Sequence, residues 1–156
     1  MATQQTQAIS IESVSKIIHN GTNKLDILKN ISFTVEKGES LAILGPSGCG
    51  KSTLLNILAG LDVPSSGIVR WYGKNISILG EEERAKMRNG VLGFVFQDFN
   101  LVNHITVLEN VMLPLELANV RNPKKVALDF LKTVGLDDRV SHLPKTLSGG
   151  EKQRVA

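Results

Sequence analysis

The stretch GPSGCGKS carries the strongest chemical signal, because it fits the pattern G-x-x-x-x-G-K-[S/T] of phosphate-binding loops. Glycines let the chain wrap a phosphate with its amides inward, Lys51 supplies a charge to the outer phosphates, and Ser52 offers a hydroxyl to Mg²⁺. A glycine-rich turn that only caps a helix is the alternative. The predicted phosphate-binding residues are Gly45, Pro46, Ser47, Gly48, Cys49, Gly50, Lys51, Ser52 and Thr53.

A second glycine pair occurs in the sequence LSGGE, where Ser148 and Glu151 have the S-x-x-E spacing of a helix capping box. Gly149 and Gly150 then fall in the first helical turn, although each glycine costs a helix about 1 kcal/mol relative to alanine. The cap requires neither glycine. Since a helix start presents free N–H groups and a positive dipole end, the pair indicates close approach of an anion.

Gln97 is a third candidate, because it directly follows an apolar run at the expected carboxyl end of a strand. Ligands of open α/β sheets bind at such ends. The glutamine could coordinate Mg²⁺ through its carbonyl oxygen or position a water molecule. The alternative is an ordinary polar loop residue.

Two nearly continuous apolar runs, residues 41–44 and 91–96, are typical of strands buried on both faces of a parallel sheet. Between them, apolar positions within residues 54–58 recur at helical spacing, and Gly60 is a suitable helix stop. The GPSGCGKS loop therefore lies between a predicted central strand and a predicted amphipathic helix. This is the setting that a phosphate-binding loop requires.

The N-terminal part predicts an antiparallel edge region. Residues 1–8 form a polar tail, and apolar residues then alternate with polar ones around Ile9 and Ile11 and again over 31–36. This period of two is typical of half-exposed strands.

The later part predicts helices. Thr106 and Glu109 form a capping box for a helix that Pro114 should kink or end. Asn122 and Pro123 then open a second helix. This helix should stop at Gly135 and bury a stripe of Val126, Ala127, Phe130, Leu131 and Val134.

Composition is that of an ordinary globular chain, with 156 residues, 42% hydrophobic and 21% charged residues, and a formal net charge of +3. The charges are dispersed, which argues against a nucleic-acid partner. No secretory signal or membrane-spanning apolar run is visible. A single cysteine, Cys49, cannot form an internal disulfide, which fits a cytoplasmic protein.

From about Ile9 onward, the chain resembles the ATPase subunits of ABC transporters. The segments that carry the resemblance are GPSGCGKSTLLNILAGLD, GFVFQDFNL, TVLENV and LSGGEKQRVA, in family order and spacing. GLDVPSSG and MRNGVLGFVFQ further resemble the subgroup of lipoprotein-releasing and macrolide-export ATPases.

The resemblance implies a P-loop α/β core over residues 9–156, with an N-terminal antiparallel β subdomain and a helical subdomain at 98–145. Gly45 to Ser52 look like the Walker A loop, Gln97 like the Q-loop glutamine, and residues 147–151 like the signature motif. The implied cofactors are ATP and Mg²⁺. Lys51 and Gln97 would act in catalysis, and Ser52 and Gln97 would bind the metal.

The same resemblance implies partners. A second copy would pair with the first, so that Ser148, Gly149 and Gly150 contact the γ-phosphate of the ATP held by the other subunit. ATP hydrolysis would drive a membrane permease from the cytoplasmic face of the cell membrane. The apolar cluster Phe99, Leu101, Val102 and Ile105 would grip a cytoplasmic helix of that permease, with core packing as the alternative.

Three departures from the family pattern bear on these expectations. Ile18, with His19 beside it, occupies the place of the aromatic residue that stacks on adenine, and Glu151 replaces a frequent glutamine. The Walker B strand, catalytic glutamate and switch histidine would all follow Ala156. The chain is therefore expected to be an N-terminal fragment, incomplete at its C-terminus and inactive by itself.

Two other functions are compatible with the motifs. ABC-type ATPases of DNA maintenance carry the same motifs, but they insert long coiled coils between the Q-loop and the signature. Here only 51 positions separate Gln97 from Ser148, without sustained heptads. A nucleotide-binding module that does not hydrolyse ATP is the other alternative.

Overall fold

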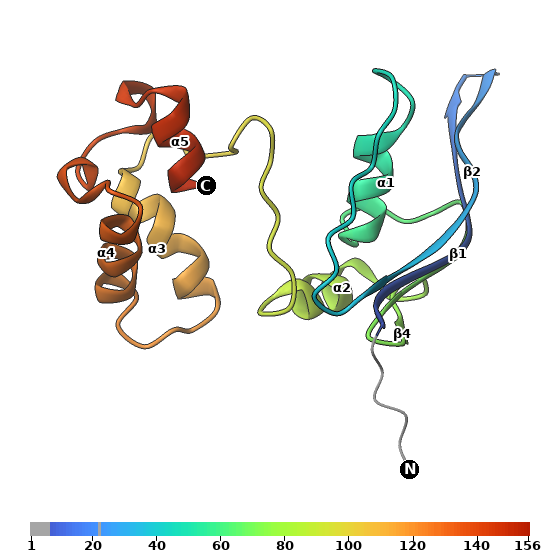
Figure 1. Cartoon of the computed structure of the whole chain (residues 1–156), viewed down its shortest axis with the longest axis horizontal. Helices are drawn as coiled ribbons and strands as arrows, with labels where there is room; N and C mark the ends of the chain where they lie inside the picture. The colour runs from blue at the N-terminus through green and yellow to red at the C-terminus, as the bar shows by residue number, and fades with distance from the viewer. Residues whose placement is uncertain (1–6, 22) are drawn as a thin grey trace, which may run out of the picture. The chain divides into compact units, whose positions relative to one another are not determined.

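The computed structural model describes residues 7–21 and 23–156 (Figure 1). The chain divides into two compact units, Met1–Leu92 and Gly93–Ala156, each of which is described by itself. The predicted polar tail at residues 1–8 lies largely outside the described residues. The predicted helical subdomain at 98–145 falls inside the second unit, and its boundaries remain a prediction.

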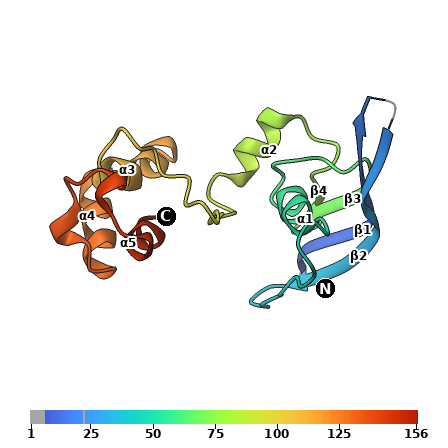
Figure 2. The same cartoon turned by 90° about the horizontal axis from the view of Figure 1, so that it is seen from above.

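An antiparallel sheet forms one layer of the first unit. Its strands run in the order β2-β1-β3-β4, with β1 at Gln7–Asn20, β2 at Asn23–Glu36, β3 at Ser66–Trp71 and β4 at Lys74–Asn75. Strands β1 and β2 form a long hairpin, and β1 pairs with β3 on its other side (Figure 2). Alternating apolar residues in β1 and β2 predicted this antiparallel region, and the prediction is confirmed.

Helix α1, Lys51–Leu58, packs its apolar stripe into the core of the first unit. The stripe and the stop at Gly60, which has a φ of +65°, are confirmed. Trp71 is only 2% exposed, and its Nε1 donates a hydrogen bond to the Leu58 carbonyl at 2.8 Å. The buried core comprises Ile11, Val14, Leu28, Leu54, Ile57, Leu58, Val69, Trp71 and Ile76.

The two predicted central strands do not form. Neither residues 41–44 nor residues 91–96 form a helix or strand, and Leu44 and Val95 are 88% and 66% exposed. A buried parallel strand needs ladder partners at its sides. Within the described part of the chain, no strand pairs with either segment. The apolar runs therefore indicate segments suited to burial, but neither segment is fully buried within the described chain.

Helix α2, Glu81–Arg88, consists largely of charged residues, yet one of its arginines is buried. Arg84 is buried and donates through Nε to the Gly60 carbonyl at 3.1 Å, and Arg88 donates to the same oxygen at 2.6 Å. Hydrogen bonds from Arg88 and Arg84 to Glu81 lower the pKa of that carboxyl. Two guanidinium groups thus satisfy the carbonyl that follows α1.

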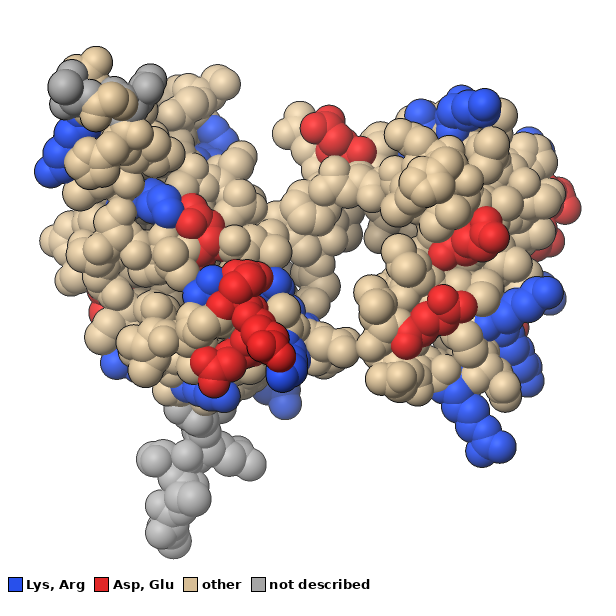
Figure 3. Space-filling model, turned by 180° about the vertical axis from the view of Figure 1, so that it is seen from behind, with Lys and Arg blue, Asp and Glu red and all other residues tan. Residues whose placement is uncertain are grey.

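The second unit contains α3 at Val107–Leu117, α4 at Pro123–Thr133 and α5 at Gly149–Val155, with short 3₁₀ turns η1 at Asp137–Arg139 and η2 at Pro144–Thr146. Its buried core consists of Val107, Leu131, Leu136 and Leu147. None of the helices formed by the described residues is both long and apolar enough to cross a membrane. On the face seen in Figure 3, acidic and basic side chains are interspersed.

The helix signals of the second unit are mostly confirmed. Thr106 caps α3 with Glu109, but α3 continues past Pro114 to its end at Leu117. Asn122 stands at the N-cap of α4 with a φ of +58°, without a side-chain capping bond, and Gly135 follows the helix with a φ of +67°.

The stripe of α4 residues that was predicted to be buried includes residues that the structure exposes. Ala127 and Leu131 are fully buried, whereas Phe130 is 55% and Val134 37% exposed. Since α4 packs mainly against α3, only one narrow face of it is covered.

Candidate phosphate-binding site

The loop from Gly45 to Gly50 joins segment 41–44, which has no regular secondary structure, to the first turn of α1. Gly48 and Gly50 have φ angles of +78° and +93°, a region that favours glycine. A Cβ added to Gly50 would lie 2.9 Å from the Ile27 carbonyl oxygen and 2.9 Å from a methyl carbon of Leu28. Strand β2 therefore presses on the loop at the point where α1 begins.

Lys51 folds over this loop. Its Nζ donates to the carbonyls of Gly45 at 2.9 Å and Pro46 at 2.7 Å, and lies 3.7 Å from the Cys49 sulfur. The ammonium group is thus at the loop itself, beside the backbone that is predicted to surround a phosphate. Cys49 is an exposed free thiol.

The first turn of α1 is open to an anion. Its N-cap, Gly50, has no side chain to bond the first amides, and no acidic residue occupies the first turn. The amides of Lys51, Ser52 and Thr53 are therefore left without helical partners, as at any helix start. Ser52 is exposed next to them. The backbone amides, Lys51 and Ser52 suit a phosphate with its magnesium ion.

Gln97 is exposed and lies in the second unit, in a turn closed by a hydrogen bond from the Phe99 amide to the Phe96 carbonyl at 3.1 Å. Phe99 and Asn100 both have left-handed φ angles, +61° and +48°, so the chain bends sharply after the glutamine. The loop residues and Gln97 belong to separately described units. Their assembly into one magnesium site therefore remains a prediction.

The capping box at α5 is confirmed. Glu151 Oε2 accepts hydrogen bonds from the Ser148 amide at 2.8 Å and the Ser148 hydroxyl at 2.7 Å, and Ser148 Oγ accepts one from the Glu151 amide at 3.3 Å. Arg139 Nε donates to Glu151 Oε1 at 3.2 Å. The hydroxyl and amide of Ser148, and then Arg139, lower the pKa of Glu151 to about 2.

Sequence inspection missed Arg139, because it precedes Glu151 by twelve residues and no helical or strand spacing links the two. The 3₁₀ turn η1 brings it to α5.

Gly149 and Gly150 are exposed, and neither has a positive φ. A Cβ on Gly149 would meet nothing within 4 Å, and one on Gly150 would meet only an Arg154 nitrogen at 3.9 Å. Neither backbone conformation nor packing within the described chain requires glycine at these positions. The backbone of Gly149 and Gly150 is therefore exposed at the surface.

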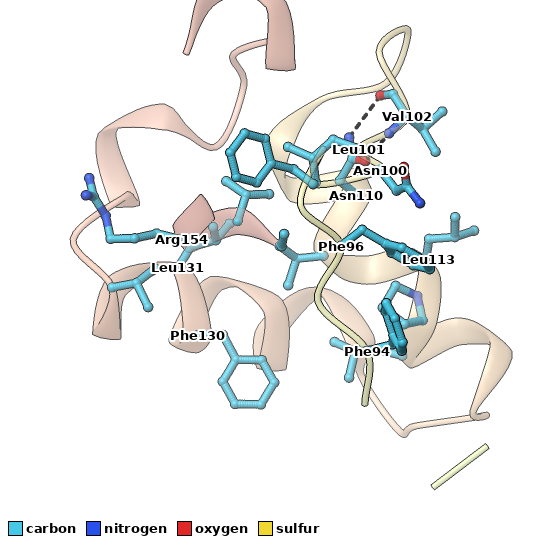
Figure 4. A pocket seen from close by; sticks show the side chains of 17 residues that line it. Phe94, Phe96, Asn100, Leu101, Val102, Asn110, Leu113, Phe130, Leu131 and Arg154 are labelled. Atoms are coloured by element: carbon cyan, nitrogen blue, oxygen red, sulfur yellow. Dashed lines mark hydrogen bonds between the residues drawn. The ribbon is translucent and has the colours of Figure 1, made fainter. Parts of the chain in front are cut away.

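A pocket of about 470 Å³ lies in the second unit, between the chain at residues 94–102 and the helices α3 and α4 (Figure 4). Phe99, Leu101 and Val102 line it, whereas Ile105 does not. Two hydrogen bonds between Asn110 and the backbone of Val102, of 2.7 and 3.1 Å, fix this loop against α3. The predicted apolar cluster is therefore half-buried and partly open.

Comparison with known proteins agrees with this geometry. The family model for ABC transporters matches residues 28–156. An uncharacterized ABC transporter ATP-binding protein of Methanocaldococcus jannaschii, MJ1508, is 49% identical over 150 residues, covering 95% of this chain and 67% of that protein. The lipoprotein-releasing system ATP-binding protein LolD of Legionella pneumophila (strain Lens) is 43% identical, covering 95% and 66%. The chain thus spans about two thirds of the length of these relatives.

Among solved structures, the chain is similar to the ATP-binding cassette MJ0796 in a dimeric post-hydrolysis state bound to ADP and Pi, with a TM-score of 0.88 and 39% identity. The match covers 94% of this chain and 66% of that one. A second dimeric structure of this bacterial ABC transporter cassette gives a TM-score of 0.87 at 40% identity. The predicted α/β fold class is therefore confirmed, and the chain belongs to the family of ABC transporter ATP-binding proteins.

Proposed function

We propose that the protein containing this chain is the ATP-binding subunit of an ABC transporter and hydrolyses ATP to drive a membrane permease. The observation that carries the proposal is the loop from Gly45 to Gly50, with Lys51 bonded across it and an uncapped helix behind it. Family membership and the ADP- and Pi-bound relative support it.

Each residue has a definite role in this proposal. Backbone amides of the loop and of the first turn of α1 surround the phosphates, while Lys51 neutralises the outer phosphate charge. Ser52 and Gln97 are the residues that would hold Mg²⁺, and the ion would supply positive charge to the phosphates. Loop amides cannot distinguish one base from another, and Ile18, with His19 beside it, stands where the family usually has an adenine-stacking aromatic residue. We therefore expect weak discrimination between bases.

The proposal includes a pair of subunits. Ser148, Gly149 and Gly150 of each copy contact the ATP of the other, which accounts for exposed glycines that the described chain itself does not require. A two-fold axis supplies two such sites. The dimeric structures of the related cassette support this arrangement.

We place the subunit at the cytoplasmic face of the cell membrane, where the pocket beside Phe99 and Leu101 receives a cytoplasmic helix of the permease. Apolar pockets of this kind suit the apolar face of an amphipathic helix. Similarity to the protein named LolD favours the lipoprotein-release subgroup.

The experiment compares the full-length protein with its Lys51→Ala variant. We expect the variant to lose ATPase activity and to bind Mg-ATP far more weakly, because a charge-assisted phosphate contact is removed. Unchanged turnover in the variant would overturn the assignment. Residues 1–156 alone should show no hydrolysis that depends on Lys51, and a Lys51-dependent rate in this piece would contradict that part of the proposal.

A further inference from the structure

The hydroxyl hydrogen of Ser148 is engaged within its own chain. The hydroxyl donates to Glu151 Oε2 at 2.7 Å and accepts from the Glu151 amide at 3.3 Å. A serine hydroxyl carries a single hydrogen, and phosphate oxygens only accept hydrogen bonds. Ser148 therefore cannot donate to a phosphate while Glu151 keeps this hydrogen.

Arg139 compensates part of the charge of the carboxylate that holds the hydrogen. Its Nε bonds to Oε1 of Glu151 at 3.2 Å, while Oε2 accepts from both the amide and the hydroxyl of Ser148. Glu151 is one-fifth exposed and Arg139 about half exposed. The carboxylate is ionised at neutral pH, as its lowered pKa requires.

The capping box of α3 provides an internal comparison. Glu109 Oε2 accepts from the hydroxyl and the amide of Thr106, both at 2.7 Å, in the same geometry. Within residues 7–21 and 23–156, the structure describes no ion pair for Glu109, whereas Glu151 pairs with Arg139. Thr106 is also followed by valine and leucine, in place of the exposed glycines that follow Ser148.

We propose that Glu151 is a positioning residue that restrains nucleotide-dependent pairing by withholding the Ser148 hydroxyl hydrogen, and that Arg139 moderates this effect. The inference rests on the proposed function, in which Ser148 to Gly150 contact the ATP of a second subunit. Glutamine at this position accepts from Ser148 without a full charge. It therefore releases the hydroxyl more readily and repels phosphate less.

The test uses the full-length protein and a non-hydrolysable ATP analogue, and it measures the analogue concentration that produces half-maximal dimer by sedimentation velocity. Glu151→Gln should lower this concentration by about three- to tenfold, the effect of one unit charge near a partly solvated phosphate. Glu109→Gln is the matched control. It weakens an equivalent helix cap and should leave the concentration unchanged.

Arg139→Met should raise the analogue concentration for half-maximal dimer by a similar factor. Without Arg139, no positive charge offsets the charge of the Glu151 carboxylate. In the Glu151→Gln background the same change should have less than about a twofold effect, since no carboxylate remains to be neutralised. An unchanged or higher concentration for Glu151→Gln overturns the inference, and so does an equal shift from Glu109→Gln.

Lys51→Ala separates this inference from the proposed function. If the wild-type protein does not dimerise with the analogue, or if Lys51→Ala dimerises equally well, the proposed function fails and this inference fails with it. If dimerisation depends on Lys51 but not on Glu151, only the inference fails.

Discussion

Gly50 and Ile27 approach each other so closely that a Cβ on Gly50 would lie 2.9 Å from the Ile27 carbonyl oxygen. The contact joins the N-cap of α1 to strand β2 at the turn that is predicted to bind phosphate. Lys51 follows directly, so its position depends on this contact as well. Ile27 lies in β2 between Asp26 and Leu28, which pair with Ile17 and Lys16 of β1.

Gly50→Ala should therefore destabilise the protein by more than its backbone conformation alone explains. A left-handed φ costs a residue with a Cβ about 1–2 kcal/mol, and the clash with Ile27 adds to that cost. Gly48→Ala is the matched control, since its φ is also positive but its Cβ would meet nothing within 4 Å. Urea unfolding of both variants measures the difference. Equal losses of unfolding free energy in Gly50→Ala and Gly48→Ala would show that β2 moves to accommodate the added methyl group.

Ile18→Tyr should tighten ATP binding. Ile18 is 45% exposed on β1, paired with Leu25 of β2. Stacking of a base on an aromatic ring contributes about 1–3 kcal/mol, or roughly 5- to 150-fold in affinity, and isoleucine has no ring. GTP should therefore compete with ATP within about tenfold in the wild-type protein.

His19→Ala is the companion to this change. If only the histidine variant alters ATP and GTP affinities, measured by calorimetry, then His19 supplies the stacking and the assignment to Ile18 is wrong by one position.

Replacing Phe99 and Leu101 with serine should weaken association with the permease and leave nucleotide binding intact. Both side chains line the pocket of the second unit, and buried apolar anchors dominate interface energies. Leu117→Ser is the control, because Leu117 is 70% exposed on α3 and does not line that pocket. Co-purification with the permease measures the outcome. Association that survives the double change would assign the cluster to core packing.

The capping bonds of Glu151 should make the free energy of unfolding depend on pH in the acidic range. Its folded-state pKa of about 2 is below the ordinary value of 4.5, so the native state favours the ionised form. The resulting stabilisation is fully present above about pH 4.5 and is lost as the pH falls toward 2. The difference in unfolding midpoint between wild type and Glu151→Gln should therefore shrink over this range. A difference that stays constant from pH 6 to pH 2 would contradict the assignment.

The sequence by itself determined the features that depend on neighbouring residues. The phosphate loop, the capping boxes at Thr106 and Ser148, and the glycine stops at Gly60 and Gly135 are set by local geometry and hydrogen bonding. Alternation in β1 and β2 likewise predicted an antiparallel sheet. The family motifs then predicted which of these features carry function.

Only the tertiary structure decided which distant groups meet. Burial of Arg84 beneath Gly60, the approach of Gly50 to Ile27 and the bond from Arg139 to Glu151 each join residues that no local periodicity relates. The expected central strands at 41–44 and 91–96 do not form, because strand formation also depends on distant groups. An apolar run shows that a segment tends to be buried, but a strand forms only where another strand supplies its hydrogen bonds, and sequence alone does not state which partner is present.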